Sequence, residues 1–468
     1  MAEQPDRAVV VGAGMGGLLA ARVLSDYFAE VVVVDRDALP SSKQQRRGVP
    51  QGRHVHVLLA RGRAVLEQHF PGFTEEVVGR GGLSGDLLGD SRIFLGGGFL
   101  VSYRSGLDVL CASRPLLETV TRGRVRGRDN VRFVEHTDAV GLTATDGRIT
   151  GLRMRQTGGG REQQMPAAVV VSAAGRAASP VRWLSELGYP VPAEQEIAVN
   201  LTYVSRTYRR RPGDLGGARF VTVVPDPPAV RSAVAFAQED DLWMVTLAGY
   251  LGEQPPTDPA GFLRFAASLP TPEVGELLSA AEPVGEPATA HFPASRRRMF
   301  ERMRTFPDGY LVVGDGISSF NPVYGQGMTV AAEESLALAT ALEHGLAGLA
   351  RRFFTAAAKI IDVPWTMAAS SDLRYRQVSG ARTAQTRFFN AYVARLLVAA
   401  RHDPVLAQAF ARTNNLLASP QSLLRPEIAA RVLLGGSAHR AWIRKQRSRR
   451  RGQESDILEA ERTGSGDP

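Results

Sequence analysis

Apolar runs near the N-terminus alternate between strand-like and helix-like patterns. The stretch "RAVVVGAGMGGLLAARVL" (7–24) starts with an apolar run that predicts a buried strand and continues with helix-forming residues. A second apolar run, "AEVVVVDRD" (29–37), predicts another strand. Strand, helix and strand in this order favour parallel strands joined by a crossover helix, so we expect an α/β unit here.

The middle and the end of the chain follow other patterns. Four β-rich runs separated by turn residues predict a second, antiparallel sheet over residues 195–250. Residues 92–103 are expected to join this sheet, and Asp146-Gly147 predicts a hairpin turn. From residue 328 onward, alanine and leucine recur at helical spacing and predict a helical region.

Composition and charge add few constraints. The chain has 468 residues and one cysteine, Cys111, which excludes a disulfide framework and is expected to be a small core residue. The sequence shows no secretory signal, and no uncharged apolar run reaches the length of roughly 18 residues that suggests a membrane span. A cytoplasmic protein without stable membrane insertion is therefore expected. Seven of the basic residues behind the net charge of +9 lie in 439–451. We expect a basic, disordered tail rather than a site for nucleic acid or an acidic partner.

A glycine motif follows the first predicted strand. Gly12, Gly14 and Gly17 have the G-x-G-x-x-G spacing, and Asp35 ends the second strand. The first glycine permits a tight turn, the second lets the backbone approach a pyrophosphate, and the third lets helix and strand pack closely. The helix N-terminus favours the phosphates, and Asp35 is expected to bind ribose hydroxyls. Arg36 is expected either to cover the adenine or to be a plain surface arginine. Together these features predict dinucleotide binding.

A second motif about 300 residues later separates FAD from NAD. In "VVGDGISSFNPVYGQGMTVAAEESLAL" (312–338), Asp315 ends a strand and can accept hydrogen bonds from ribityl or ribose hydroxyls. Gly325 and Gly327 leave room for a flavin ring, and the helix starting near Met328 points its positive end at that ring. We therefore predict FAD as cofactor. A structural loop without a ligand is the alternative.

These residues resemble a known family. "GDGISSFNPVYGQGMTVA" is similar to the second flavin motif of p-hydroxybenzoate hydroxylase-like FAD monooxygenases. Three further stretches resemble the actinobacterial flavin epoxidases of polyether pathways, which are akin to squalene epoxidase: "RRGVPQGRHVHVLLARG" (46–62), "CASRPLLE" (111–118) and "VVVSAAGRAASPVRWLSELGYP" (169–190). The resemblance covers roughly residues 5–435.

The resemblance implies roles for further residues. Arg114 matches an arginine that meets FAD, and the flavin loop comprises Gly325, Gln326, Gly327 and Met328. Arg47 and Gln51 lie in a loop expected to run beside the flavin, although a solvated basic loop is the alternative. Pro322 and Tyr324 are expected near its reactive edge, or as residues that only shape the loop.

One segment departs from the family. Relatives read Asp-Ala-Thr-Gly-Arg where this chain has Ser172, Ala173, Ala174, Gly175 and Arg176. The loss of the acid, and the lack of a second glycine motif, place direct reduction by NAD(P)H in doubt. A separate flavin reductase is the expected partner.

The resemblance implies oxygen transfer. Reduced FAD would react with O2, and a flavin C4a-hydroperoxide would pass one oxygen atom to a small apolar substrate, with epoxidation of a polyketide or polyene alkene favoured. An alkene needs no general base, whereas a phenol benefits from one, and the sequence offers no clear candidate. The alternatives are an aromatic hydroxylase, a polyprenyl reductase and a flavin-binding partner protein without turnover.

Two other chemistries are disfavoured. His54 and His56 would share one face of a strand, but no Cys, Asp or Glu cluster completes a metal site, so none is predicted. Trp365 resembles half of a flavin-halogenase tryptophan motif, yet those enzymes also use a lysine, and residues 44–358 contain none.

The expected organisation is an α/β fold: a Rossmann-type FAD-binding domain, an antiparallel substrate domain and a C-terminal helical region. The FAD-binding domain is predicted at 1–190, with 85–110 joining the substrate sheet, and resumes at 296–345. The substrate domain is predicted at 191–295, the helical region at 346–440 and the tail at 441–468.

Overall fold

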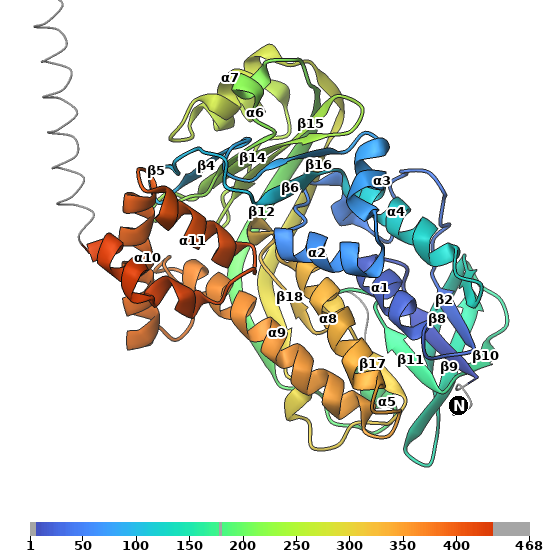
Figure 1. The fold of residues 1–468 in the computed structure, drawn as a ribbon. Helices are drawn as coiled ribbons and strands as arrows, with labels where there is room; N and C mark the ends of the chain where they lie inside the picture. Colours follow the sequence, from blue (N-terminus) through green and yellow to red (C-terminus); the bar gives the residue numbers. More distant parts are fainter. Residues whose placement is uncertain (1–5, 177–179, 434–468) are drawn as a thin grey trace, which may run out of the picture.

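The computed structural model describes residues 6–176 and 180–433. The predicted tail, 441–468, lies outside these ranges. Figure 1 shows an α/β half that carries the N-terminus, a large sheet beside it, and C-terminal helices at one end of that sheet. In the described ranges, no helix is long and apolar enough to cross a membrane.

Five parallel strands form the sheet of the first half, in the order β17-β11-β1-β2-β7. The valines of β1, β2, β11 and β17 are almost fully buried, because helices or a second sheet cover both faces, and such strands have continuous apolar sequences. The valines of the edge strand β7 are partly buried. The strands are β1 (Arg7–Val11), β2 (Glu30–Val34), β7 (Val131–Val134), β11 (Val169–Ser172) and β17 (Tyr310–Val312).

Helices and a small sheet complete this half. Helix α1 (Met15–Leu24) packs against both α4 (Arg114–Arg126) and α8 (Gly327–Leu342) in its core. A three-stranded antiparallel sheet, β10-β9-β8, packs against β11 and includes the hairpin at Asp146-Gly147. Its strands are β8 (Thr137–Thr145), β9 (Arg148–Gln156) and β10 (Gln163–Pro166). The remaining elements here are α2 (Ala60–His69), α3 (Phe73–Gly79), α5 (Pro180–Glu186) and the pair β3 (Leu83–Asp86) and β6 (Asp108–Cys111).

Eight strands form the second sheet, in the order β18-β16-β12-β15-β14-β13-β4-β5. The chain enters this sheet on both sides of residue 295, the predicted end of the substrate domain, because β16 and β18 both belong to it. Strand β17, which lies between them in sequence, pairs with β11 in the parallel sheet. Its strands are β4 (Ser91–Leu95), β5 (Gly98–Phe99), β12 (Glu194–Arg209), β13 (Phe220–Val223), β14 (Arg231–Gln238), β15 (Leu242–Gly249), β16 (Pro283–Arg298) and β18 (Ser318–Ser319).

The two faces of the large sheet have different neighbours. Val221 and Val245 lie on the face covered by α6 (Pro259–Ala267) and α7 (Glu273–Ala280). Thr222 and Thr246 follow them in sequence and line a cavity on the opposite face. This alternation follows from the two-residue period of a strand.

The C-terminal helices close the other side of that cavity. Helix α9 (Leu349–Asp372) leads from the α/β half, and α10 (Ala384–Ala400) and α11 (Pro404–Asn414) form a cap. Leu396 and Leu406 pack with Leu100 and Phe236, so the cap is joined to the sheet by a shared apolar core.

Candidate functional site

The glycine motif forms the tight connection between β1 and α1. Gly12 has φ +100°, and a Cβ there would lie 2.8 Å from the carbonyl oxygen of Ala173. A Cβ on Gly17 would lie 1.8 Å from the carbonyl oxygen of Gly12. Both positions therefore require glycine, one for its backbone conformation and one for the close packing of helix on strand.

Gly14 borders open space. A Cβ there would meet Arg114 Nη2 and Glu118 Oε1 only at 4.0 Å. Helix α1 begins directly after Gly14, without a side-chain cap and without an acid in its first turn. Its first amides are consequently available to a phosphate, and the helix end attracts negative charge.

Asp35 organises the adjoining backbone. Its Oδ2 accepts a 2.7 Å hydrogen bond from the amide of Ala13, and its Oδ1 accepts one of 2.8 Å from the amide of Asp37. Buried Arg46 lies 3.4 Å from Asp35 Oδ2 and donates to Glu118 at 3.0 Å and to the carbonyl of Ala13. Arg46 is thus a buried basic residue that Asp35, Glu118 and the backbone of the glycine motif hold in place.

Glu118 links this cluster to Arg114, whose Nε donates to it at 2.6 Å. Burial alone would raise the pKa of Glu118, but the charges of Arg114 and Arg46 outweigh burial and lower it. His56 lies nearby and donates from Nδ1 to the carbonyl of His54 at 3.1 Å. Burial and the Arg114 charge lower the pKa of His56 to about 3, so its ring is neutral.

The second motif lies across from the first. Asp315 is in η4 (Gly314–Gly316), the turn that follows β17, and makes no hydrogen bond or ion pair within the described ranges. Burial raises its pKa, and the charges of Arg114 and Arg176 oppose that rise. Buried Glu334 on α8 accepts a 2.6 Å hydrogen bond from the amide of Gly314 and holds this turn.

The entrance to α8 is bare of capping side chains. Gly325 has φ +64° and ends η5 (Pro322–Tyr324), and Gly327 begins α8. Gln326 is 2% exposed, and its Oε1 has no hydrogen-bond partner in the part of the chain that the structure describes. Met328 is buried in the core of the α/β half.

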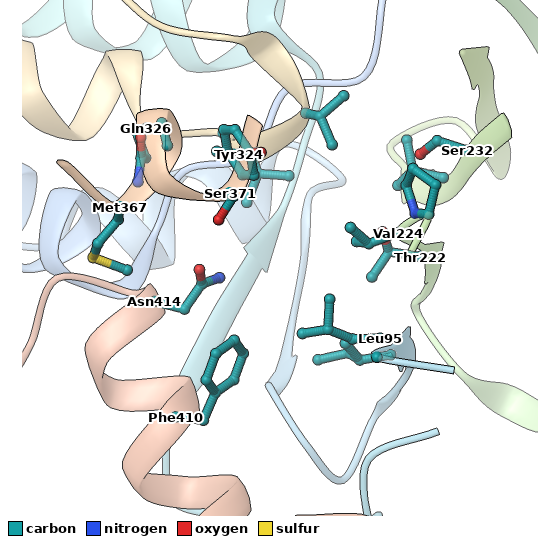
Figure 2. A pocket seen from close by; sticks show the side chains of 18 of the residues that line it. Leu95, Thr222, Val224, Ser232, Tyr324, Gln326, Met367, Ser371, Phe410 and Asn414 are labelled. Atoms are coloured by element: carbon teal, nitrogen blue, oxygen red, sulfur yellow. The ribbon is translucent and has the colours of Figure 1, made fainter. Parts of the chain in front are cut away.

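An apolar cavity of about 400 Å³ lies next to this entrance. Its wall includes Pro322, Tyr324, Gly325 and Gln326 from the loop before α8. Figure 2 shows Tyr324 and Gln326 on the same side as Met367 and Ser371 of α9 and Phe410 and Asn414 of α11, facing Leu95, Thr222, Val224 and Ser232 across the space. A mostly apolar pocket with a few polar groups is typical of a small-molecule site.

A buried acid lies behind Tyr324. Its hydroxyl donates at 2.7 Å to Oδ1 of Asp372, which also accepts a 3.0 Å bond from Asn321. Asn321 donates in addition to the hydroxyl of Tyr250, another residue of the cavity wall. Asp372 is 0% exposed, its Oδ2 has no partner among the described residues, and burial raises its pKa to about 7.

His54 contributes a second polar group to the cavity wall. Its Nδ1 lies 2.8 Å from Ser205 Oγ, which lies 2.6 Å from Thr246 Oγ1. Burial lowers the pKa of His54 to about 4. Residues 54–57 form a loop rather than the strand considered for the two histidines. In the described ranges, no group of three or more His, Cys, Asp or Glu side chains is arranged to hold a metal.

The predicted site residues fall into two groups. Gly14, Arg114, Asp315 and Gly327 lie around one space between α1, α4 and α8. Arg36 and Arg47 are exposed, and Gln51 is partly exposed. Sequence reasoning missed four residues of this region. They are Arg46, Glu118, Glu334 and Asp372. For Glu118, Glu334 and Asp372, the available signal was an acid within a stretch of apolar or small residues, whereas Arg46 lies in a polar, basic stretch that gave no such signal.

Residues 7–359 match the family described as FAD binding domain. The chain belongs to this family. FAD is its cofactor, and the structure fits that group: Gly14 leaves a backbone cradle that a side chain would fill, while Asp315 and Gln326 Oε1 offer unpartnered polar atoms. Gly14 and the start of α1 would hold the pyrophosphate, Asp315 the ribityl chain, and the entrance to α8 the ring.

Several known proteins are similar to this chain over most of its length. Protein Rv3254 of Mycobacterium tuberculosis is 32% identical over 470 residues, which cover 95% of this chain and 96% of that protein. The flavin-dependent brominase Bmp2 has a similar fold, with TM-score 0.64 and 14% identity over 95% of this chain and 100% of that one. PqsL of Pseudomonas aeruginosa, solved in complex with 2-aminobenzoylacetate, has TM-score 0.58 and 20% identity over 80% and 98%. The closer resemblance to polyether-pathway epoxidases stays a prediction.

Proposed function

We propose that this chain is an FAD-dependent monooxygenase that transfers one oxygen atom from O2 to an apolar substrate. One observation carries the proposal: the loop that would hold the flavin ring, from Pro322 to Gln326, is also a wall of the apolar cavity. Cofactor and substrate would therefore meet at that loop. FAD supplies the oxygen chemistry when bound.

The residues of the cavity contribute enclosure and orientation. Side chains from the large sheet, from α9 and from α11 surround the space and keep bulk water away from the flavin-facing wall. Water exclusion protects a reactive oxygen donor from side reactions. Neutral His54 and the phenol of Tyr324 are the polar groups that would orient a substrate atom at this wall.

Epoxidation of an alkene in a polyketide or polyene is our first choice of reaction. The wall is mainly apolar, and alkene π electrons need no base to attack an electrophilic oxygen. Aromatic hydroxylation is the second candidate, because Asp372 behind Tyr324 is a proton acceptor of the kind that the sequence did not reveal.

Halogenation is not proposed. No described lysine lines the cavity: Lys43 pairs with Asp240 at the surface, and Lys359 is exposed on α9. Trp365 is buried and packs beside Phe320, so it belongs to the core.

The test is product analysis with isotopically labelled oxygen. The purified holoprotein would be incubated with a panel of polyenes and phenols, a flavin reductase and labelled O2, and products would be read by mass spectrometry. One labelled oxygen atom in a product supports the proposal, and its position separates epoxide from phenol. A saturated product without oxygen consumption would instead identify a polyprenyl reductase. Neither product nor oxygen uptake across the panel would favour a partner protein without turnover.

A further inference from the structure

An open depression of about 440 Å³ adjoins the apolar cavity. Pro227, Arg374 and Asn390 line both spaces, so the depression lies at an end of the cavity. It is bordered by the end of α9, the segment after it and the start of α10. A group that extends out of the cavity at this end would enter the depression.

Arginine dominates the lining of the depression. Arg374, Arg376, Arg382 and Arg387 all contribute, and none of the described lining residues is acidic. Asp226 pairs with Arg374 from the cavity side and offsets one of the four charges. The depression therefore keeps a positive potential that favours an anion.

The four arginines differ in how many of their side-chain N–H groups already donate to protein acceptors. Arg382 donates to the carbonyls of Leu373, Tyr375 and Val378, so it fixes the turn that follows α9. Arg387 donates from Nη1 to the carbonyl of Arg382 at 2.6 Å, so its other side-chain N–H groups can donate to a ligand. The backbone carbonyl of Arg376 accepts a hydrogen bond from Arg382, but its exposed side chain makes no hydrogen bond or ion pair within the described ranges. Arg376 and Arg387 thus present donors to a ligand from a scaffold that Arg382 holds.

We propose that this arginine-lined depression binds an anionic group, a carboxylate or a phosphate, carried by the substrate whose apolar part fills the cavity. Resting on the proposed function, the inference narrows the substrate class to amphipathic acids. Arginine suits this task because its planar guanidinium can donate two parallel hydrogen bonds to a carboxylate or phosphate.

A separate anion, such as free phosphate or the phosphate of a nucleotide, shares this chemistry. The shared lining of the two spaces favours the substrate's own anion, because an anion bound in the depression lies at the end of an apolar space of ligand size. A test must therefore compare one apolar chain with and without its charge.

The experiment is a fluorescence titration of the holoprotein with cis-parinaric acid, a polyene, and with its uncharged methyl ester. We expect the acid to bind about tenfold more tightly than the ester, since two charge-assisted contacts are involved. Arg376→Gln combined with Arg387→Gln should reduce acid binding to the level of the ester and leave ester binding unchanged. Arg395→Gln, on the exposed side of α10 and outside both linings, is the matched control and should change neither.

Several outcomes would overturn the proposal. Equal affinities for acid and ester in the wild type would do so, as would the absence of binding by both. If added inorganic phosphate binds while acid and ester bind equally, the depression takes a separate anion. Should the double variant fold poorly, Arg376→Gln alone keeps the test valid, because this side chain has no contact to lose. Binding is read without turnover, so failure here is distinct from the absence of labelled product.

Discussion

The hydroxyl of Tyr324 donates a 2.7 Å hydrogen bond to Oδ1 of Asp372, a residue 48 positions later that ends helix α9. The bond joins the loop before α8 to a helix that lines the apolar cavity. A phenol at the cavity wall is thereby coupled to a buried carboxyl group whose pKa is raised to about 7. Strongly shifted acids in clefts are candidates for function.

Asp372 should make stability depend on pH in a defined direction. Because its folded pKa is raised from 3.8 to about 7, the folded protein loses stability as pH rises between these values. Asp372→Asn keeps an acceptor for Tyr324 and should gain about 2–4 kcal/mol above pH ~7, with the gain shrinking toward pH ~4. Urea unfolding across this range is the measurement. The exposed Asp129→Asn variant is the control, and a pH-independent gain would contradict the assigned pKa.

Gly14→Val should yield a folded protein that does not retain FAD. The added side chain would enter the space bordered by Arg114 and Glu118, where the pyrophosphate is expected, yet it would meet no protein atom closer than about 4 Å at its Cβ. Flavin absorbance of the purified protein and circular dichroism would be compared with Gly123→Val, whose site on α4 is open. A yellow Gly14→Val protein with full FAD content would show that the cofactor does not pass over this glycine.

Asp315→Ala should weaken FAD binding by about 1.5–3 kcal/mol, roughly ten- to 150-fold in Kd. The carboxylate has no partner among the described residues, so its hydrogen bonds are available to the hydroxyls of the cofactor. A fluorescence titration of FAD into apoprotein measures the loss. Exposed Asp308→Ala should have no effect. An unchanged Kd for Asp315→Ala would assign this acid another role.

Electron supply is the fourth test. Ser172, where the resemblance to flavin monooxygenases implies an acid, is buried at the end of β11, and its carbonyl accepts a hydrogen bond from the amide of Val313. If the altered segment means that no nicotinamide site exists, NADPH alone should bleach the bound flavin slowly and without saturation. A flavin reductase should restore rapid reduction. Anaerobic stopped-flow absorbance distinguishes these cases, and fast, saturable bleaching by NADPH alone would reject the two-component hypothesis.

Much of the local geometry around the glycine motif could be predicted from the sequence. Gly12, Gly14, Gly17 and Asp35 lie within one strand–helix–strand unit, where short-range spacing dictates the backbone path. The period-2 pattern likewise predicted the antiparallel strands within residues 195–250, because β12, β13, β14 and β15 each present one face to α6 and α7. It did not show that β4 pairs with β13 in parallel.

Other parts of the site depended on contacts between distant segments. Arg46 and Arg47 are adjacent and chemically identical, and only the folded loop places Arg46 inside and Arg47 in solvent. Asp372 belongs to no sequence motif, and only the tertiary structure shows that it accepts a hydrogen bond from Tyr324. The arginine-lined depression forms where the end of α9 meets α10. Local steric rules act over a few residues, so the sequence pattern predicts strands, helices and turns. Burial and charge pairing depend on which distant segments come into contact, and only the tertiary structure shows those contacts.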